Sequence, residues 1–370
     1  MHYYGWRGES GGVHDDDVEP LILKPDRSVL DEALERLAPT APEFGSGLSN
    51  HGPMAAEALV QLGCSEAVLP WSEEYMRQLE PAPRLGNRIS SSAWIEARGV
   101  IRRYPDWQAT FMALAQEQPW QELVSLWVPR LLPGAIAAAT HCLIRTAHAV
   151  RALRQSDTEA RREELATALA YWASSYVELP GVPLLRGHRA IAEAAAALPL
   201  IPQAERRGGL ITDQALCADV APGWQEALSS VEPPVDIGAS LTALTGAFAR
   251  WYVSYADTEP IAFVHGVTAP AAVRILLPYL PRESQALGFA YAWQACASLR
   301  VALGVEGRVM DPGPPVSAGD LDIREVVEQA VDGGDEHAIK MTEACLREYE
   351  LSPDPWYLTA AKDVAGRLHR

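Results

Sequence analysis

Apolar residues recur every three or four positions along most of this chain, and strict alternation of apolar and polar residues is scarce. The first pattern is typical of amphipathic helices and the second of half-buried strands, so the sequence predicts an all-α protein. The longest helices are expected at residues 106–117, 120–132, 135–154, 159–179, 237–257, 260–280 and 282–304.

Prolines and glycines mark the boundaries between these segments. Pro53 falls in the first turn of an expected helix that ends at Gly63. Between residues 180 and 234 prolines and glycines are frequent, and only short helices are expected, at 188–198 and 223–230. A long irregular stretch of this kind is a candidate lid or connecting arm.

The helix expected at residues 335–346, DEHAIKMTEACL, carries His337 and Lys340 three positions apart, and therefore on one face. Neutral imidazole binds metals, whereas an ammonium group repels them. A buried lysine that has lost its proton can capture carbon dioxide as a carbamate, which binds a metal as a carboxylate does. The alternative is a solvated helix whose histidine and lysine both face water.

Composition and charge exclude several classes of protein. The formal net charge of −17 and the pI near 5.0 argue against binding to nucleic acid or to an anionic membrane surface. The most apolar stretch, residues 261–280, is interrupted by His265, Pro270 and Arg274, so no membrane span is expected.

The five cysteines are odd in number and never closely spaced, which argues against a disulfide framework and a zinc ribbon and indicates a reducing compartment. The first twenty residues have no apolar signal region and include Asp15, Asp16 and Asp17, so a flexible N-terminal tail and a cytoplasmic protein are expected. The oligomeric state is left open between a monomer and a homodimer.

Six of the nine histidines lie outside the terminal tails, and four of these lie in, or at the start of, four separate expected helices. His51 precedes Gly52 and Pro53, His141 and His265 lie inside apolar helices, and His337 opens the helix at 335–346. Burying several imidazoles without a common partner is costly, and a metal ion would satisfy them together. The alternative for each is a core histidine hydrogen-bonded to a carbonyl or carboxylate.

Two further residues lie near His141 on the same expected helix. His148 is two turns beyond His141 on nearly the same face, with Arg145 between them. His188 is flanked by arginines and is expected to be exposed. The chain contains no GxGxxG, P-loop, HExxH or GxSxG motif.

Four segments in this order resemble the questin oxidase family, whose fungal members open a ring of anthraquinone polyketides: LSNHGPMAAEALVQLG, ATHCLIRTAH, IAFVHGVTAPAAVRILLPYL and DEHAIKMTEACL. The resemblance spans residues 28–366 and is carried by these short blocks rather than by continuous similarity. It implies a single large helical domain over 28–366, after a tail at 1–27, with a metal site in the helix core.

The resemblance further implies a mononuclear non-haem Fe(II) ion held by four histidines and a carboxylated lysine. Carried over by position, the ligands are His51, His141, His265 and His337, with Lys340 as the carbamate. Five ligands leave one octahedral position, for dioxygen as the co-substrate, so a small aromatic polyketide would bind outside the metal's ligand sphere. The implied reaction is an oxidative C–C cleavage of an anthraquinone or anthrahydroquinone that resembles a Baeyer–Villiger ring opening.

One departure from the family pattern concerns substrate choice. Where a further histidine is expected one turn after His141, this chain has Arg145, and His148 comes later. His148 and Arg145 are therefore the candidates for acid–base and substrate-directed roles. Three other functions stay open: a metal-free NADPH-dependent Baeyer–Villiger oxidase, a zinc hydrolase with a carbamylated lysine, and a non-catalytic helical binding protein.

Overall fold

The computed structural model describes residues 27–305, 313–317, 319 and 321–370. The predicted tail at 1–27 therefore lies almost wholly outside the described residues. The described chain is an all-α single domain, as the sequence predicts: 67% of the described residues are helical and 2% are in strands. Two strands of two residues each, β1 (Glu43–Phe44) and β2 (Leu48–Ser49), pair as an antiparallel hairpin that leads into His51.

The helices of the N-terminal half are α1 (Arg27–Leu37), α2 (Gly52–Gln61), α3 (Ser65–Met76), α4 (Trp94–Ala97), α5 (Tyr104–Glu117), α6 (Trp120–Leu131), α7 (His141–Gln155) and α8 (Glu159–Ser175). Three short helices follow in the irregular region: α9 (Ile191–Ala196), α10 (Ile211–Ala215) and α11 (Trp224–Leu228). Of these, α9 and α11 fall within the two short helices that the sequence predicts.

The helices of the C-terminal half are α12 (Ile237–Tyr255), α13 (Pro260–Leu276), α14 (Arg282–Leu303), α15 (Ile323–Gly333), α16 (Glu336–Leu351) and α17 (Pro355–Arg367). Short 3₁₀ turns occur at Ile101–Arg103, Leu132–Gly134, Gln203–Glu205, Ala218–Val220 and Leu277–Tyr279. Four of these helices begin at an aspartate whose carboxylate accepts hydrogen bonds from backbone N–H groups of the first turn: α12, α15, α16 and α17.

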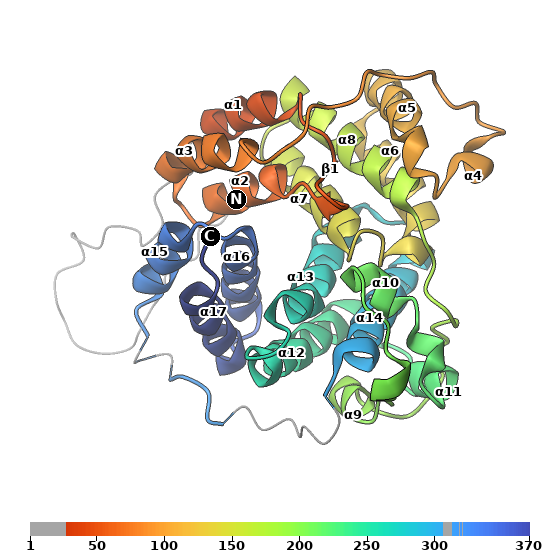
Figure 1. Cartoon of the computed structure of the whole chain (residues 1–370), viewed down its shortest axis with the longest axis vertical. Coiled ribbons are helices and arrows are strands. Elements are labelled where there is room, and N and C mark those ends of the chain that lie inside the picture. The colour runs from red at the N-terminus through yellow and green to blue at the C-terminus, as the bar shows by residue number, and fades with distance from the viewer. Residues whose placement is uncertain (1–26, 306–312, 318, 320) are drawn as a thin grey trace.

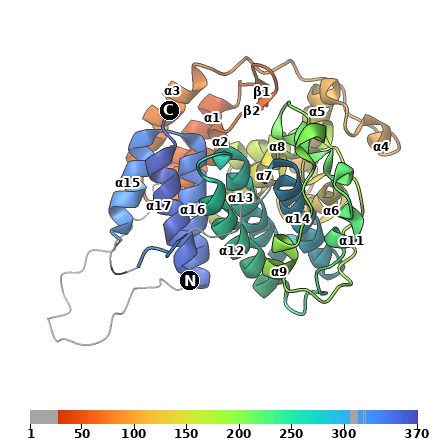
Figure 2. The same ribbon diagram turned by 60° about the horizontal axis from the view of Figure 1, so that its bottom comes forward.

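Four helices pack in a closed ring around the centre of the molecule (Figures 1 and 2). α2 packs against α7, α7 against α13, α13 against α16, and α16 against α2. These are the helices in which, or at whose start, the four candidate histidine ligands lie. The ring therefore decides how close those histidines come to one another.

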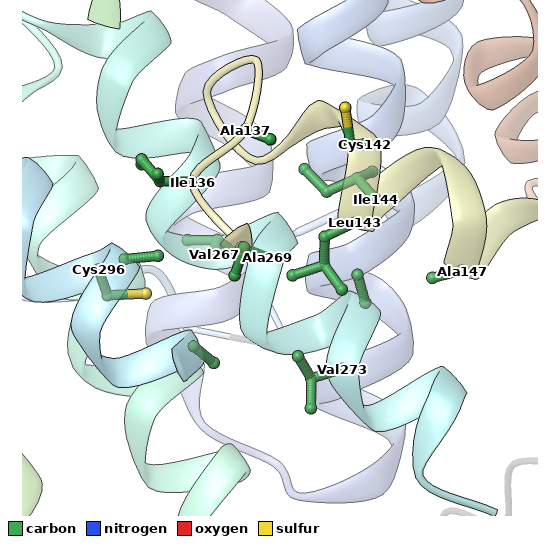
Figure 3. Close-up of a cluster of buried hydrophobic side chains, with 14 of the residues drawn as sticks. Ile136, Ala137, Cys142, Leu143, Ile144, Ala147, Val267, Ala269, Val273 and Cys296 are labelled. Atoms are coloured by element: carbon green, nitrogen blue, oxygen red, sulfur yellow. The ribbon is translucent and has the colours of Figure 1, made fainter. Parts of the chain in front are cut away.

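α13 is the core helix of this arrangement and also contacts α12 and α14. Figure 3 shows apolar side chains of α13, including Val267 and Val273, among those of α7 and α14. Among the described residues, the helical stretch 260–279 is the one long and apolar enough to cross a membrane, but 72% of its most apolar window is buried inside the protein. Core helices show the same combination, and here the apolar side chains pack against neighbouring helices.

A glycine sets the distance between α13 and α12. A Cβ atom on Gly266 would lie 2.5 Å from Cδ1 of Phe248, which is fully buried on α12. Only a residue without a side chain allows the two helices to approach this closely. Gly266 directly follows His265, so the same contact fixes the depth of that histidine.

The helix predicted at 135–154 begins later than expected, at His141. Residues 135–140 form turns instead, and Ala138, Ala139 and Thr140 have φ angles of 49°, 53° and 70°. These three consecutive residues are in the left-handed region, which costs roughly 1–2 kcal/mol for each residue with a side chain. The prediction was wrong because alanine favours right-handed helix, and nothing in the local sequence indicates a left-handed turn.

Candidate metal centre

The structure brings His51, His141, His265 and His337 together. The ring centroid of His51 lies 4.3 Å from that of His141 and 4.6 Å from that of His337. The ring centroids of His141 and His265 are 4.5 Å apart. All four are buried, with 1–8% of each residue exposed. Nitrogen atoms of His51, His141 and His337 lie within 4.8 Å of one another, which is close enough for them to share one ion.

Three of these imidazoles lie at the N-terminal ends of helices. His51 is the N-cap residue of α2, His141 is the first residue of α7, and His337 is the second residue of α16. The carboxylate of Asp335 caps α16 by accepting hydrogen bonds from the backbone N–H groups of His337 and Ala338, at 2.8 and 3.0 Å. The positive ends of three helix dipoles therefore meet at the cluster, and they favour negative charge there.

The Nε2 atoms of His141 and His265 face each other at a distance that a shared cation would explain. Nδ1 of His141 is 2.6 Å from the carbonyl oxygen of Ala138, and Nδ1 of His265 is 2.8 Å from that of Ile261. When each Nδ1 donates to its carbonyl, both Nε2 atoms carry bare lone pairs, and these two atoms are 3.1 Å apart. Ligands at right angles around one metal, each about 2.1 Å from it, are separated by roughly 3.0 Å, so the spacing fits two ligands of one ion.

The left-handed turn before α7 accounts for the orientation of His141. Residues 138–140 reverse the chain so that the carbonyl of Ala138 reaches back to the imidazole three residues later. A carbonyl that holds Nδ1–H fixes both the tautomer and the direction of Nε2. Backbone strain of this kind is retained where the surrounding structure depends on it.

Lys340 is the fifth residue of the cluster. It is 2% exposed, and its Nζ lies 3.4 Å from Nδ1 of His51. Burial lowers the pKa of Lys340 to about 8, although the carboxylates of Glu336 and Asp335 act in the opposite direction. The neutral fraction of this amine near neutral pH is therefore far larger than for an ordinary lysine, and a neutral amine is required for reaction with carbon dioxide.

Three of the histidines, His51, His141 and His265, are held neutral, as metal ligands must be. Burial is the largest effect that places the pKa values of His51, His141 and His265 well below the usual histidine value, and the nearby Lys340 lowers them further. Nδ1 of His337 is buried and has no hydrogen-bond partner among the residues the structure describes. A buried donor or acceptor without a partner is costly, and a metal ion would provide one.

Two carboxylates that the sequence interpretation did not assign lie beside the imidazoles. Oε1 of Glu336 is 3.6 Å from Nδ1 of His51, and Oδ1 of Asp335 is 3.6 Å from Nδ1 of His337. They offset the positive potential of the three helix ends and of a divalent cation. Glu336 stands four residues before Lys340, and this spacing was the available signal for its proximity.

Arg145 and His148 are held by other contacts. The guanidinium of Arg145 donates to both carboxylate oxygens of Glu164 on α8, at 2.6 and 2.8 Å. Nδ1 of His148 is 2.6 Å from Oε2 of Glu57 on α2, and burial lowers the pKa of this histidine despite that carboxylate. Their catalytic roles stay predictions, whereas the exposed position predicted for His188 is confirmed.

The irregular region at 180–234 contacts the two segments that lead into the cluster. The backbone N–H of Ala139, two residues before His141, donates to Oγ1 of Thr212 on α10 at 2.6 Å. Next to α10, the side chain of Leu210 lies beside Gly47 of the hairpin that leads to His51. The region at 180–234 therefore packs against the segments that precede His141 and His51, in addition to connecting helices.

Comparison with known proteins adds no assignment. No protein-family model matches the chain, and no curated protein matches it. The resemblance to the questin oxidase family therefore stays a prediction from four sequence segments, and the function is argued from the geometry of the cluster.

Proposed function

We propose that the chain is a non-haem Fe(II)-dependent oxygenase that cleaves a C–C bond in a ring of an aromatic polyketide, such as an anthraquinone in its reduced form. The observation that carries this proposal is the pair of facing Nε2 atoms of His141 and His265, 3.1 Å apart, within a cluster of four imidazoles and a buried lysine. Imidazole suits iron, zinc, copper and nickel, so the donor set fits a transition metal.

The ligands would be His51, His141, His265, His337 and the carbamate of Lys340. Iron in this site would supply the activation of dioxygen that ring cleavage requires. Five such ligands would leave one position for dioxygen, so the organic substrate would bind beside the metal rather than on it. In a zinc hydrolase that position would hold the attacking water. The ligand set alone does not decide between iron and zinc.

The chain's own groups prepare the site for an anionic substrate. The positive ends of α2, α7 and α16 favour the phenolate of a hydroquinone over its neutral phenol, whereas the carboxylates of Glu336 and Asp335 act in the opposite direction. The side chain of Glu336, 15% exposed, lies at the cluster and can accept the phenol proton at Oε1. Because Nδ1 of His148 is bonded to Glu57, His148 can contribute to proton transfer only through Nε2.

Metal analysis of protein purified without oxygen tests the proposal. Iron near one equivalent per chain supports it, zinc favours the hydrolase, and protein without metal contradicts both. Oxygen uptake is then measured against a panel of reduced anthraquinones. We expect uptake that depends on iron and on substrate, whereas iron-loaded protein that consumes no oxygen with any member of the panel would contradict the proposed reaction.

Replacement of Lys340 distinguishes a carbamate from a structural lysine. Lys340→Ala is expected to lose most oxygen uptake and to recover part of it when formate or acetate is added, because a small carboxylate can fill the vacated position. Lys362→Ala, at an exposed lysine of α17, is the matched control and should behave as the parent. Full activity in Lys340→Ala would show that the lysine is not a ligand.

A further inference from the structure

A run of buried ion pairs crosses the same helices that carry the histidines. Arg151 of α7 holds Glu57 of α2 with two guanidinium nitrogens, one of them 2.8 Å from Oε1. A third nitrogen of Arg151 donates to Oε1 of Glu343 on α16. One side chain therefore joins α2, α7 and α16, whose first residues lie at the histidine cluster.

The run continues to the fourth helix of the ring. Glu343 accepts a hydrogen bond from Arg347 at 3.0 Å, and Arg347 donates to Glu348 at 2.9 Å. Glu348 in turn accepts from Nε of Arg274 on α13, at 2.9 Å. All four helices that position the histidines are therefore connected through one continuous set of charges.

The three glutamates of this run are buried, and three arginines balance their charge. The side chains of Glu57, Glu343 and Glu348 are 2%, 5% and 0% exposed. Burial alone would raise the pKa of Glu343, but Arg151 and Arg347 hold it at about 2, so this carboxylate is ionised. A buried ion pair adds little net stability compared with apolar packing, but it can fix the register of the elements it joins.

The charges form a second layer below the imidazoles. Glu57 follows His51 by six residues, Arg151 follows His141 by ten, and Arg274 follows His265 by nine. At the rise of an α-helix these separations correspond to roughly 9–15 Å along the axes. A shift of any of these helices along its axis would break ion pairs in this layer and move a nitrogen ligand in the layer above.

We propose that Arg151 is a positioning residue for the metal centre. By holding Glu57 and Glu343, it fixes the height and rotation of α2 and α16 relative to α7, and so the separations of His51, His141 and His337. The inference rests on the proposed function, because its consequence is the affinity of the cluster for a metal ion. Neighbouring groups that orient metal ligands typically change metal affinity 10- to 100-fold when altered.

The test compares two buried arginines. Arg151→Lys keeps a positive charge but loses the fork that joins two helices. Arg161→Lys is the matched control, because Arg161 of α8 is fully buried and pairs with Asp31 of α1. It also donates to the backbone carbonyl of Ala152 on α7, so it anchors one helix of the ring rather than joining two of them. Glu343→Gln is the second variant, with nearly the same shape as the parent, in case Arg151→Lys folds poorly. Each protein is titrated with Co²⁺, whose visible absorption reports the ligand set.

Arg151→Lys and Glu343→Gln are expected to bind Co²⁺ at least about tenfold more weakly, with an altered absorption spectrum, while Arg161→Lys binds it as the parent does. If both arginine variants merely lose thermal stability, their Co²⁺ affinities should not differ from each other. Parent-like Co²⁺ binding and spectra in Arg151→Lys and Glu343→Gln would overturn the inference alone. A parent protein that binds no Co²⁺ would overturn the proposed function and this inference with it.

Discussion

A lysine nitrogen lies 3.4 Å from an imidazole nitrogen in the interior of this protein, with three further imidazoles close by. At the scale of single residues this arrangement is unfavourable without a ligand, because burial disfavours every charged form and the facing lone pairs repel. A carbamate on the lysine and a metal ion between the imidazoles would remove both difficulties. The residue-scale predictions therefore concern the metal-free protein, in which no ligand offsets the destabilising effect of these buried groups.

Lys340→Met is expected to stabilise metal-free protein in buffer freed of carbon dioxide. The pKa of Lys340 is about 8 in the folded protein, below the ordinary value of 10.5. Below pH 8 both folded and unfolded chains hold the proton, so the folded parent carries the full cost, up to roughly 3 kcal/mol. Between pH 8 and 10.5 the unfolded chain binds more protons, so the parent's stability rises and the advantage of the variant shrinks.

Urea unfolding at pH 7 and pH 10 measures this difference. Lys362→Met serves as the control, because Lys362 is exposed and its replacement should change stability little at either pH. A Lys340→Met variant less stable than the parent at pH 7 would show that the ammonium form is well accommodated.

The left-handed turn predicts opposite effects of one substitution at two alanines. Ala138→Gly should raise the free energy of unfolding by about 1 kcal/mol, because glycine tolerates the positive φ of 49°. Ala113→Gly, at a half-buried position inside α5, should lower it by about 1 kcal/mol, because glycine is unfavourable inside a helix. Urea unfolding of both variants checks the signs, and a loss of stability at both positions would show that the turn carries no strain.

At the scale of elements, the ring formed by α2, α7, α13 and α16 determines where the imidazoles lie. Three contacts hold these helices in place: the close approach of α13 and α12 at Gly266, the cap of Asp335 on α16, and the ion pairs of Arg151. Helix existence was predictable from hydrophobic spacing, and so was the shared face of His337 and Lys340. Neither the ring nor the pairing of Arg151 with Glu57 was predictable, because residues 94 positions apart leave no local signal.

Gly266→Ala is expected to lower the free energy of unfolding by about 1–3 kcal/mol and to weaken metal binding, because the new methyl group would force α13 away from Phe248 and move His265. Gly288→Ala is the control on the neighbouring α14. There the added carbon would lie 3.1 Å from a side-chain atom of Val273, and alanine improves helix propensity by about 1 kcal/mol. Urea unfolding and Co²⁺ titration of both variants test this, and equal behaviour of the two would contradict it.

At the scale of the whole molecule, segments from both ends of the chain meet at the centre, and no single segment holds the site. His51 comes from the N-terminal quarter, and His337 and Lys340 from the last tenth. The sequence interpretation selected five residues that the structure brings together, partly through histidine spacing and partly through a family resemblance. It missed Glu336, although the four-residue spacing from Lys340 was a signal for it. It also missed the strained turn before His141, because backbone strain depends on the folded chain.

Diffraction from crystals of the Fe(II)-loaded protein, recorded at the iron absorption edge, tests the central claim most directly. The account predicts one anomalous peak at a distance of about 2.1 Å from a nitrogen of each of His51, His141, His265 and His337. Density for a carbamate on Lys340 should reach the same peak. A peak held by other residues, or no peak among these imidazoles, would contradict the account.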